Sequence, residues 1–388
     1  MQTTSPPPRM TSRLNLRDLS LALALFAVAA FFTLKVPGFN FLSSRNLSLL
    51  MIDFSITATL AIGMLLVILP GHIDLSAGSG VGLIGGIGAV LVTNHHWPPA
   101  AALLTGLAVA LVLWSAMGAL IVKQRIPAFI ITLGGLLVFK GLFWQVIDNH
   151  TVPIVTGGQR NLYSLLTTYY LPPAAGYVLA AGVVAALVFV RWKARTARKS
   201  YGFETDDGEL TFLKLFLAAQ IVFLFVLITN QFRGVPLPVL ILGVVALIVW
   251  VLTQHTPFGR YLYAIGGNEE AAVISGIPVE RVTIGAFTLM GAIVALTGFM
   301  QTAYGGSSTT TVGDLMELDA VAACVIGGAS LKGGRGSVLG VLCGALIMAC
   351  LLNGMSLLSV EPEKKFIARG AVLILAVWMD VRLSRKTA

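Results

Sequence analysis

Charged residues are scarce in this chain of 388 residues. Asp, Glu, Lys and Arg make up only 11% of it, whereas soluble globular proteins carry about 25%. Hydrophobic residues make up 56%, and the mean hydropathy is +0.87. Apolar stretches of membrane-spanning length recur almost from end to end. The composition therefore excludes an ordinary soluble domain and predicts an all-α, polytopic membrane protein.

Acidic residues are fewer than basic ones, 17 against 26, which gives a net charge of +9. In a soluble protein this excess would suggest nucleic acid as the partner. Here the basic residues lie between apolar segments, where lipid headgroups are the better partner. The sequence predicts contact with membrane lipid and no binding of nucleic acid.

The features of an enzyme with its own cofactor are also missing. The three cysteines, Cys324, Cys343 and Cys350, are odd in number and lie in apolar or Gly-rich stretches, which argues against a disulfide framework. The five histidines show no metal-ligand spacing, and no Walker A loop is present. We expect no metal, no cofactor and no enzymatic activity, so any ATP that drives this protein must be hydrolysed by another subunit.

A span length of roughly 20 residues divides the chain into about twelve predicted membrane helices. They follow a polar, Pro-rich tail at residues 1–18. The predicted spans are 19–34, 47–69, 73–93, 98–122, 127–147, 173–192, 212–230, 236–254, 282–303, 316–331, 338–358 and 366–381. The span at 316–331 is short and interrupted by glycine.

The distribution of Lys and Arg predicts the orientation of these helices. If they alternate from a cytoplasmic N-terminus, most Lys and Arg residues lie on the cytoplasmic side, as the positive-inside bias requires. Both termini are then cytoplasmic. The predicted location of the protein is the inner membrane of a bacterium. The polar loop at 193–211 becomes a cytoplasmic linker between a first transmembrane half, 19–192, and a second half, 212–388. This linker fits either a solvated connection or a contact with a partner.

The two halves share a short glycine pattern. Gly78-Ser79 with Gly82 and Gly86 matches Gly336-Ser337 with Gly340 and Gly344, and each copy follows a break, at Pro70-Gly71 and at Gly333-Gly334. Small residues four apart let membrane helices approach closely. Repeats with broken helices at matching positions point to a transport pathway, although Gly-rich helices also match by chance.

One polar stretch between the membrane helices of the second half predicts a short surface helix at 268–276. Asn268 is a good N-cap, and Glu269 and Glu270 follow in the first turn, where the helix dipole favours acidic residues. Gly276 suits the position after the C-cap. Such a helix is either an ordinary capped loop or a contact that another protein can grip.

This segment resembles a known family. Glu270-Ala271-Ala272, followed by Gly276, is similar to the E-A-A…G coupling loop of ATP-binding-cassette importer permeases. Further ordered motifs resemble the ribose/xylose/arabinose group of monosaccharide permeases over roughly residues 45–382. They are YAIGGNEEAAVISGI around the surface helix, GHIDLSAGSGVGLIGG at Gly71–Gly86, MELDAVAACVIGGASLKGGRGSVLG at Met316–Gly340, LNGMSLL at Leu352–Leu358 and LILAVWMD at Leu373–Asp380.

The length of the chain resembles the xylose type within this group. Ribose-type permeases are shorter, and the extra basic loop and membrane pair at 173–230, followed by FRGVPLPVL at Phe232–Leu240, look like the xylose type. His72 departs from the pattern, because the family often has Glu before Ile-Asp-Leu-Ser.

The resemblance implies a homodimer around one central path, with a periplasmic sugar-binding protein and two cytoplasmic ATPase subunits. The ATPases would dock on the helix from Asn268 to Gly276.

Polar residues near the ends of apolar segments are candidates for the substrate path. They are Asp74, Ser76, Lys140, Glu317, Asp319 and Asn353. Asp74 and Ser76 fit helix N-capping at the Pro70-Gly71 break or the wall of the path.

The other four candidates also have two interpretations. Lys140 either faces a cavity or snorkels outward. Asn353 fits an interhelical hydrogen bond or a ligand contact, and Glu317 and Asp319 suit a helix cap or a pore mouth. The predicted function is the permease subunit of a monosaccharide importer, with D-xylose as the expected sugar. The alternatives are an ion-coupled secondary transporter of a small polar solute, which needs an intramembrane carboxylate or His relay, and a passive channel.

Overall fold

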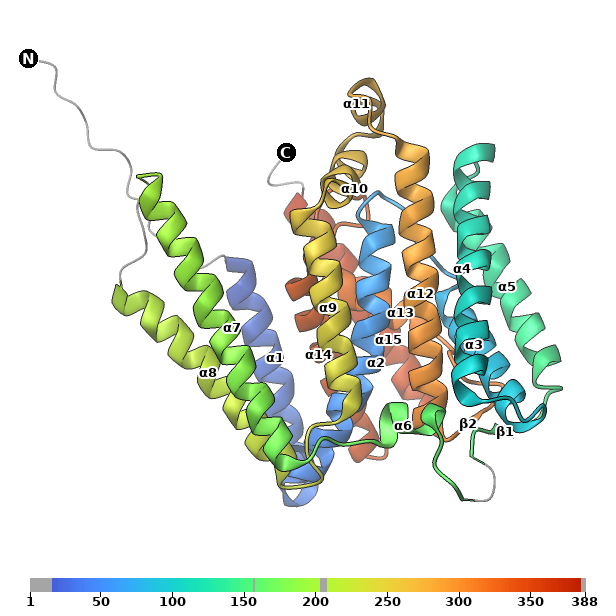
Figure 1. Cartoon of the computed structure of the whole chain (residues 1–388), viewed down its shortest axis with the longest axis horizontal. Helices are drawn as coiled ribbons and strands as arrows, with labels where there is room; N and C mark the ends of the chain where they lie inside the picture. Colours follow the sequence, from blue (N-terminus) through green and yellow to red (C-terminus); the bar gives the residue numbers. More distant parts are fainter. Residues whose placement is uncertain (1–15, 156–157, 203–207, 385–388) are drawn as a thin grey trace, which may run out of the picture.

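The computed structural model describes residues 16–155, 158–202 and 208–384 (Figure 1). The predicted N-terminal tail up to residue 15, the acidic centre of the predicted linker (203–207) and the last four residues lie outside this range. Within it, the fold is almost entirely helical, as predicted. Strands β1 (Val152–Pro153) and β2 (Ser307–Ser308) form one short antiparallel pair.

The helices follow the predicted spans closely. In chain order they are α1 (Leu16–Lys35), η1 (Pro37–Leu42), α2 (Ser44–Ile68), α3 (Ala77–Thr93), α4 (Pro99–Gln124), α5 (Ala128–Val146), α6 (Leu162–Thr168), α7 (Pro173–Ser200), α8 (Gly208–Asn230), α9 (Leu237–His255), α10 (Pro257–Gly267), α11 (Glu269–Ile274), α12 (Val279–Gly305), α13 (Met316–Ile326), α14 (Val338–Leu357) and α15 (Pro362–Ser384).

Among the described helices, fewer qualify as membrane crossings than the twelve predicted spans. Of the described helices, eight are long and apolar enough to cross a membrane by length and composition. The 11 residues of α13 span only about 16 Å at 1.5 Å per residue, about half of the hydrocarbon thickness. The predicted span at 316–331 is therefore too short to cross as a helix by itself. The predicted span at 73–93 likewise begins with non-helical backbone, because α3 starts only at Ala77.

Helix α2 forms the centre of the bundle. It packs against α9, α12, α13 and α14, and it is the most deeply buried of the eight candidate spans. Helices α3 and α4 pack on the other side of α12, and α5 covers α3. In Figure 1, α11 lies at one end of the bundle, while β1, β2 and α6 lie at the opposite end. The loops before α3 and α13 enter this bundle from these two ends.

Helices α7 and α8 form a hairpin at the edge of the molecule (Figure 1). Their apolar side chains are largely exposed, for example Val178 and Ile221, as expected of helices that face lipid. Helix α7 continues to Ser200, so the first part of the predicted linker is helical and carries its basic residues on the helix.

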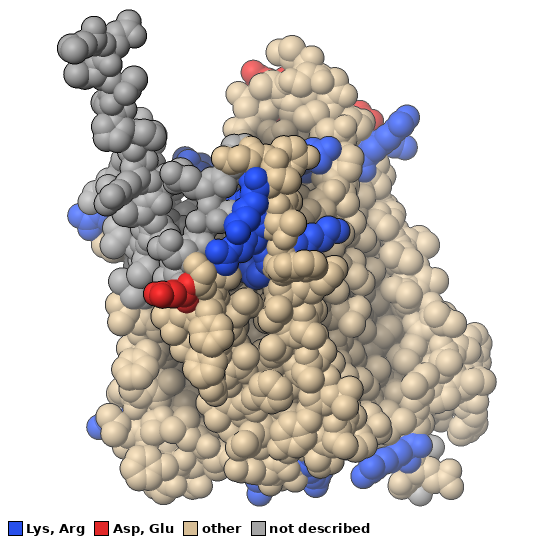
Figure 2. Space-filling model, turned by 60° about the vertical axis from the view of Figure 1, so that its left-hand side comes forward, with Lys and Arg blue, Asp and Glu red and all other residues tan. Residues whose placement is uncertain are grey.

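Charged side chains gather at the two ends of the bundle. Figure 2 shows Lys and Arg toward the upper part of the visible face and along its lower rim, with a broad band between them that is almost free of charged residues. A belt of this kind is what a hydrocarbon layer about 30 Å thick demands. The distribution agrees with an orientation across a membrane.

The two glycine patterns both serve as close backbone contacts, but their surroundings differ. A Cβ atom on Gly82 would lie 2.6 Å from the Val312 carbonyl oxygen, and one on Gly344 would overlap the Ala323 carbonyl oxygen. Ser337 caps α14, because its Oγ accepts from the Gly340 amide at 3.1 Å. Ser79 instead lies inside α3. The repeated sequence therefore reflects a shared need for small residues.

Candidate functional site

The loop of residues 69–76, here called the first loop, carries Asp74 and Ser76 into the interior. Both side chains are fully buried. The Ser76 amide and hydroxyl donate to Asp74 Oδ1 at 2.8 and 2.5 Å, and Trp114 Nε1 of α4 donates to Oδ2 at 2.6 Å. Neither side chain makes the predicted capping bond to an amide of α3. Asp74 therefore holds the loop against α4.

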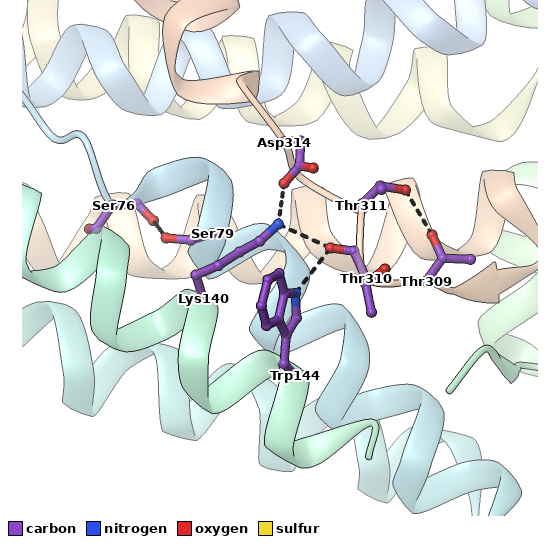
Figure 3. Close-up of polar contacts among 8 residues, drawn as sticks. All are labelled: Ser76, Ser79, Lys140, Trp144, Thr309, Thr310, Thr311 and Asp314. Carbon is purple, nitrogen blue, oxygen red and sulfur yellow. Dashed lines mark hydrogen bonds and ion pairs between the residues drawn. The ribbon is translucent and has the colours of Figure 1, made fainter. Parts of the chain in front are cut away.

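The loop of residues 309–315, here called the second loop, precedes α13 and is anchored to α5. Lys140 Nζ forms an ion pair with Asp314 and donates to the Thr310 carbonyl oxygen at 3.0 Å. Trp144 Nε1 donates to the same carbonyl oxygen at 3.3 Å, and the Lys140 ammonium lies 5.5 Å from the Trp144 ring centre. Figure 3 shows both side chains of α5 pointing at this loop. Lys140 thus faces a specific acidic partner.

The second loop and the start of α13 meet the first turn of α3, just after the first loop, in the interior of the bundle. A Cβ atom on Gly78, in the first turn of α3, would overlap Glu317 Oε2, and one on Gly313 would overlap the Gly78 carbonyl oxygen. Gly313 also adopts a positive φ of 86°, which favours glycine. Glu317 is buried at this junction, only 6% exposed. Only residues without side chains permit such a close approach of the second loop to the first turn of α3.

A polar pocket of about 580 Å³ lies beside this junction, toward the end of the bundle that carries β2. It is formed by α2, the end of α12, the second loop, α13, the end of α14 and α15. Its hydrogen-bonding side chains are Asn46, Asp53, Thr57, Gln301, Tyr304, Thr311, Asp314, Asp319, Asn353, Ser356 and Arg369. The volume falls within the usual range for small-molecule sites.

An ion pair crosses the wall of the polar pocket. Arg369 Nη2 of α15 lies 3.3 Å from Asp319 Oδ2 of α13. The other carboxylate oxygen, Asp319 Oδ1, and Arg369 Nε are buried and have no partner among the described residues. Buried polar atoms are nearly always hydrogen-bonded, so these two atoms keep hydrogen-bonding capacity that the described residues do not fill.

Two further contacts order the rest of the polar pocket. Asn46 and Asn353 exchange hydrogen bonds, with Nδ2 to Oδ1 distances of 2.9 and 3.2 Å. Asn353 is therefore both an interhelical contact, as one interpretation predicted, and a residue of the pocket. Asp53 of α2 accepts a hydrogen bond from Tyr304. These bonds fix the orientation of groups that line the pocket.

The structure brings some predicted residues together and adds others. Asp319 and Asn353 line the polar pocket, Glu317 lies at the junction, and Lys140 reaches the second loop. Sequence reasoning missed Asp53 and Arg369, although each is a charged residue inside a predicted span, which is itself a functional signal. It also missed Asn46, Gln301, Tyr304, Asp314 and Trp114, whose roles depend on contacts between distant segments.

Helix α11 has the predicted caps. Asn268 Oδ1 accepts from the Ala271 amide at 2.9 Å. At the other end, the Gly276 amide donates to the Val273 carbonyl oxygen at 2.9 Å, and the Ile277 amide donates to the Ala272 carbonyl oxygen at 3.0 Å. These two bonds form the Schellman pattern. Gly276 has a positive φ of 78°. Ala271, like Glu269 and Glu270, is exposed, whereas Ala272 is buried.

A second pocket of about 1060 Å³ lies under α11 and is here called the α11 pocket. It is lined by His72 of the first loop, by the turn between α4 and α5, and by Glu269 and the start of α12. Burial lowers the pKa of His72 below its usual value, and the charge of Glu269 acts in the opposite direction. The two pockets lie toward opposite ends of α12, because the α11 pocket is lined by its start, at Val279, and the polar pocket by its end, at Gln301 and Tyr304.

Comparison with known proteins places the chain in a family. The family described as "Branched-chain amino acid transport system / permease component" matches residues 46–377. The chain belongs to this permease family. The match begins in α2 and ends in α15, so it contains the first and second loops, the polar pocket, the α11 pocket and α11 itself.

Individual relatives of this permease cover nearly its whole length. It is 38% identical over 374 residues to the xylose transport system permease protein XylH of Escherichia coli (strain K12), over 96% of this chain and 94% of that protein. The Haemophilus influenzae XylH is 39% identical, over 96% and 98% of the two chains. The ribose import permease protein RbsC of Escherichia coli (strain K12) is 33% identical over 98% of both. No solved structure matches the chain.

Proposed function

We propose that this chain is the permease subunit of an ATP-binding-cassette importer that moves a monosaccharide, D-xylose first, into the cytoplasm. Its relatives at 38–39% identity are xylose transport permeases and align along nearly the full length. The identity to the ribose import permease is lower, at 33%. This order favours xylose over ribose.

The observation that carries the proposal is the polar pocket. A sugar is neutral and offers hydroxyl groups that both donate and accept hydrogen bonds. Carboxylate, amide, hydroxyl and guanidinium groups line the pocket, and Asp319 Oδ1 and Arg369 Nε have no partner among the described residues. Sugar hydroxyl groups can donate to the carboxylate and amide oxygens of this lining and accept from its amide and guanidinium N–H groups. In this proposal the path continues past Glu317 and Ser76 toward the α11 pocket.

The remaining parts of the importer follow from this assignment. Two copies of the chain form the membrane unit, and both termini face the cytoplasm. A cytoplasmic ATPase subunit docks on α11 of each copy, and a periplasmic sugar-binding protein delivers sugar at the opposite end, beside the polar pocket. ATP binding shifts the population between outward- and inward-facing states because the ATPases contact the two states differently.

The proposal is tested by transport in reconstituted vesicles. The chain is co-reconstituted with its ATPase and binding protein, and uptake of labelled D-xylose is measured with and without ATP. We expect ATP-dependent uptake that unlabelled D-xylose reduces more strongly than D-ribose does. A matched control replaces the ATPase by a variant that cannot hydrolyse ATP. Uptake by the chain alone, driven by an ion gradient and abolished by an ionophore, would instead identify the secondary transporter.

A further inference from the structure

Three segments far apart in the sequence meet through glycine backbone, and one of them is α10, the helix that leads into α11. They are the start of the first loop at Gly71, helix α10 at Gly266, and the turn of residues 327–337 at Gly333 and Gly334. A Cβ atom on Gly333 would lie 2.7 Å from Gly266 Cα and 2.9 Å from the Gly71 nitrogen. The two breaks that precede the glycine repeats are thus in contact with each other. We call this contact the glycine joint.

Hydrogen bonds close the glycine joint. The Gly334 amide donates to the Leu69 carbonyl oxygen at 2.9 Å. Tyr263 of α10 donates through its hydroxyl to the Gly336 carbonyl oxygen at 2.9 Å, and Gln254 of α9 donates to that hydroxyl at 3.1 Å. The joint therefore consists of direct backbone contacts at Gly71, Gly266, Gly333 and Gly334, and the Tyr263 side chain adds one bond from α10 to the turn of residues 327–337.

The glycine joint connects α11 to the first loop and to the turn between α13 and α14. On one side, α10 passes through Asn268 directly into α11. On the other, Gly71 stands three residues before Asp74 in the first loop, and the turn of residues 327–337 joins α13 to α14. These two helices carry Asp319 and Asn353 of the polar pocket.

We propose that Gly266, Gly333 and Tyr263 are positioning residues that transmit movement of α11 to the first loop and to α13 and α14. This inference rests on the proposed function, in which an ATPase pushes on α11. Because backbone packs directly on backbone, a displacement of α10 cannot be absorbed by a change of side-chain rotamer. The joint thereby couples the ATPase to the solute path.

The neighbouring glycines of α10 supply a matched pair of variants. A Cβ atom on Gly266 would overlap the Leu69 carbonyl oxygen and the Gly334 nitrogen, whereas one on Gly267 would meet nothing within 4 Å. Both changes to Ala add one methyl group to the same helix. Gly266→Ala separates the joint, and Gly267→Ala leaves it intact. Neither variant alters the exposed surface of α11.

The experiment measures sugar transported per ATP hydrolysed in the complete reconstituted complex, together with co-purification of the ATPase. Gly266→Ala should keep the ATPase bound but lower the sugar-to-ATP ratio by about tenfold, within the usual size of coupling between sites. Gly267→Ala should match the wild type in both measurements. A role in folding alone would lower transport and ATP hydrolysis together and leave their ratio unchanged.

Tyr263→Phe provides a second variant that adds no atoms. It removes the donor to Gly336 and should lower the same ratio by about threefold, the value of one ordinary hydrogen bond. It decides the matter if Gly266→Ala fails to accumulate in the membrane. An unchanged ratio in every variant that accumulates would overturn the inference. Failure of the wild-type chain to bind the ATPase would instead refute the proposed function.

Discussion

Trp114 of α4 donates its indole N–H to Asp74 at 2.6 Å, and this bond ties the first loop to the helix beside it. Both carboxylate oxygens of Asp74 are occupied, one by Trp114 and one by Ser76. The carboxylate is fully buried, so its hydrogen bonds must be satisfied within the protein. These bonds fix the position of the first loop against α4.

Trp114→Phe should weaken the attachment of the first loop to α4. The substitution leaves Asp74 Oδ2 buried without its donor, which costs about 1–3 kcal/mol. Thermal unfolding of the purified protein should show the loss, and sugar uptake per folded molecule should fall, as it should for Asp74→Ala and Ser76→Ala. Ser79→Ala is the control, because the Ser79 hydroxyl donates to the Ser76 carbonyl oxygen and does not touch Asp74. Normal uptake per molecule in Asp74→Ala and Ser76→Ala would remove both residues from the path.

The ion pair between Lys140 and Asp314 should control the position of the second loop. Its two side chains are partly exposed, at 23% and 47%, so its loss should cost no more than about 1 kcal/mol of stability. The rate of sugar uptake should fall more strongly than stability does, because Asp314 also lines the polar pocket. Uptake rates of Lys140→Gln, Asp314→Asn and the double variant form the test. If the effects of the single variants simply add, the two residues act independently.

The sequence predicted the features of this protein that depend on neighbouring residues. The caps of α11 follow from Asn268 and Gly276, which act within one or two turns of the same helix. The apolar runs likewise predicted the membrane helices, since about 20 apolar residues suffice to recognise each one. The composition of the chain and its family motifs led to the permease family that the comparisons confirm.

The interior loops could not be read from the sequence in the same way. The break at Pro70-Gly71 was visible in the sequence, but the position of the first loop depends on Trp114, 40 residues away, and that of the second loop on Lys140, 174 residues away. Such contacts leave no local pattern. Asp53 and Arg369 are a different case, because a charged residue inside an apolar run is visible without a structure.

Arg369→Gln should damage the polar pocket directly. Asp319 then loses its charged partner at 3.3 Å, and the ligand loses a guanidinium donor. A hydrogen bond to a charged group contributes about 1.5–3 kcal/mol, so we expect KM for sugar to rise by about ten- to a hundredfold. Initial uptake rates over a range of sugar concentrations separate KM from the maximal rate. The control is Lys364→Gln in the same helix, which breaks an exposed ion pair with Glu361 just before α15 and should leave both unchanged.

The proposed orientation can be tested by labelling of cysteines. After Cys324, Cys343 and Cys350 are replaced by Ser, single cysteines are placed at Tyr201, after α7, and at Thr387. Neither should react with an impermeant thiol reagent applied to spheroplasts, whereas both should react in inverted vesicles. A cysteine at Glu361, which precedes α15 at the opposite end of the bundle, is the control and should react in spheroplasts. Labelling of Tyr201→Cys or Thr387→Cys from outside would refute the predicted topology.

Helix α11 provides the sharpest test of coupling to an ATPase. Its C-terminal turn depends on Gly276 at φ 78°. The left-handed conformation costs a residue with a Cβ atom about 1–2 kcal/mol, and more if it is β-branched. Gly276→Val should therefore distort the Schellman turn, while Gly276→Asn should preserve it, because Asn tolerates this conformation. Glu270→Lys should act differently, by placing a cation at the positive end of the helix dipole and reversing a charge at the contact.

All three variants should still insert and fold, because α11 is exposed and lies outside the candidate membrane spans. Co-purification of the ATPase and sugar-stimulated ATP hydrolysis should fall strongly in Gly276→Val, clearly in Glu270→Lys and little in Gly276→Asn. The contrast between the Val and Asn variants separates the need for a left-handed backbone at position 276 from the loss of glycine as such. Full ATPase association and full coupled transport in Gly276→Val would show that α11 is not the coupling element, and the ATPase would then have to bind elsewhere on this end of the bundle.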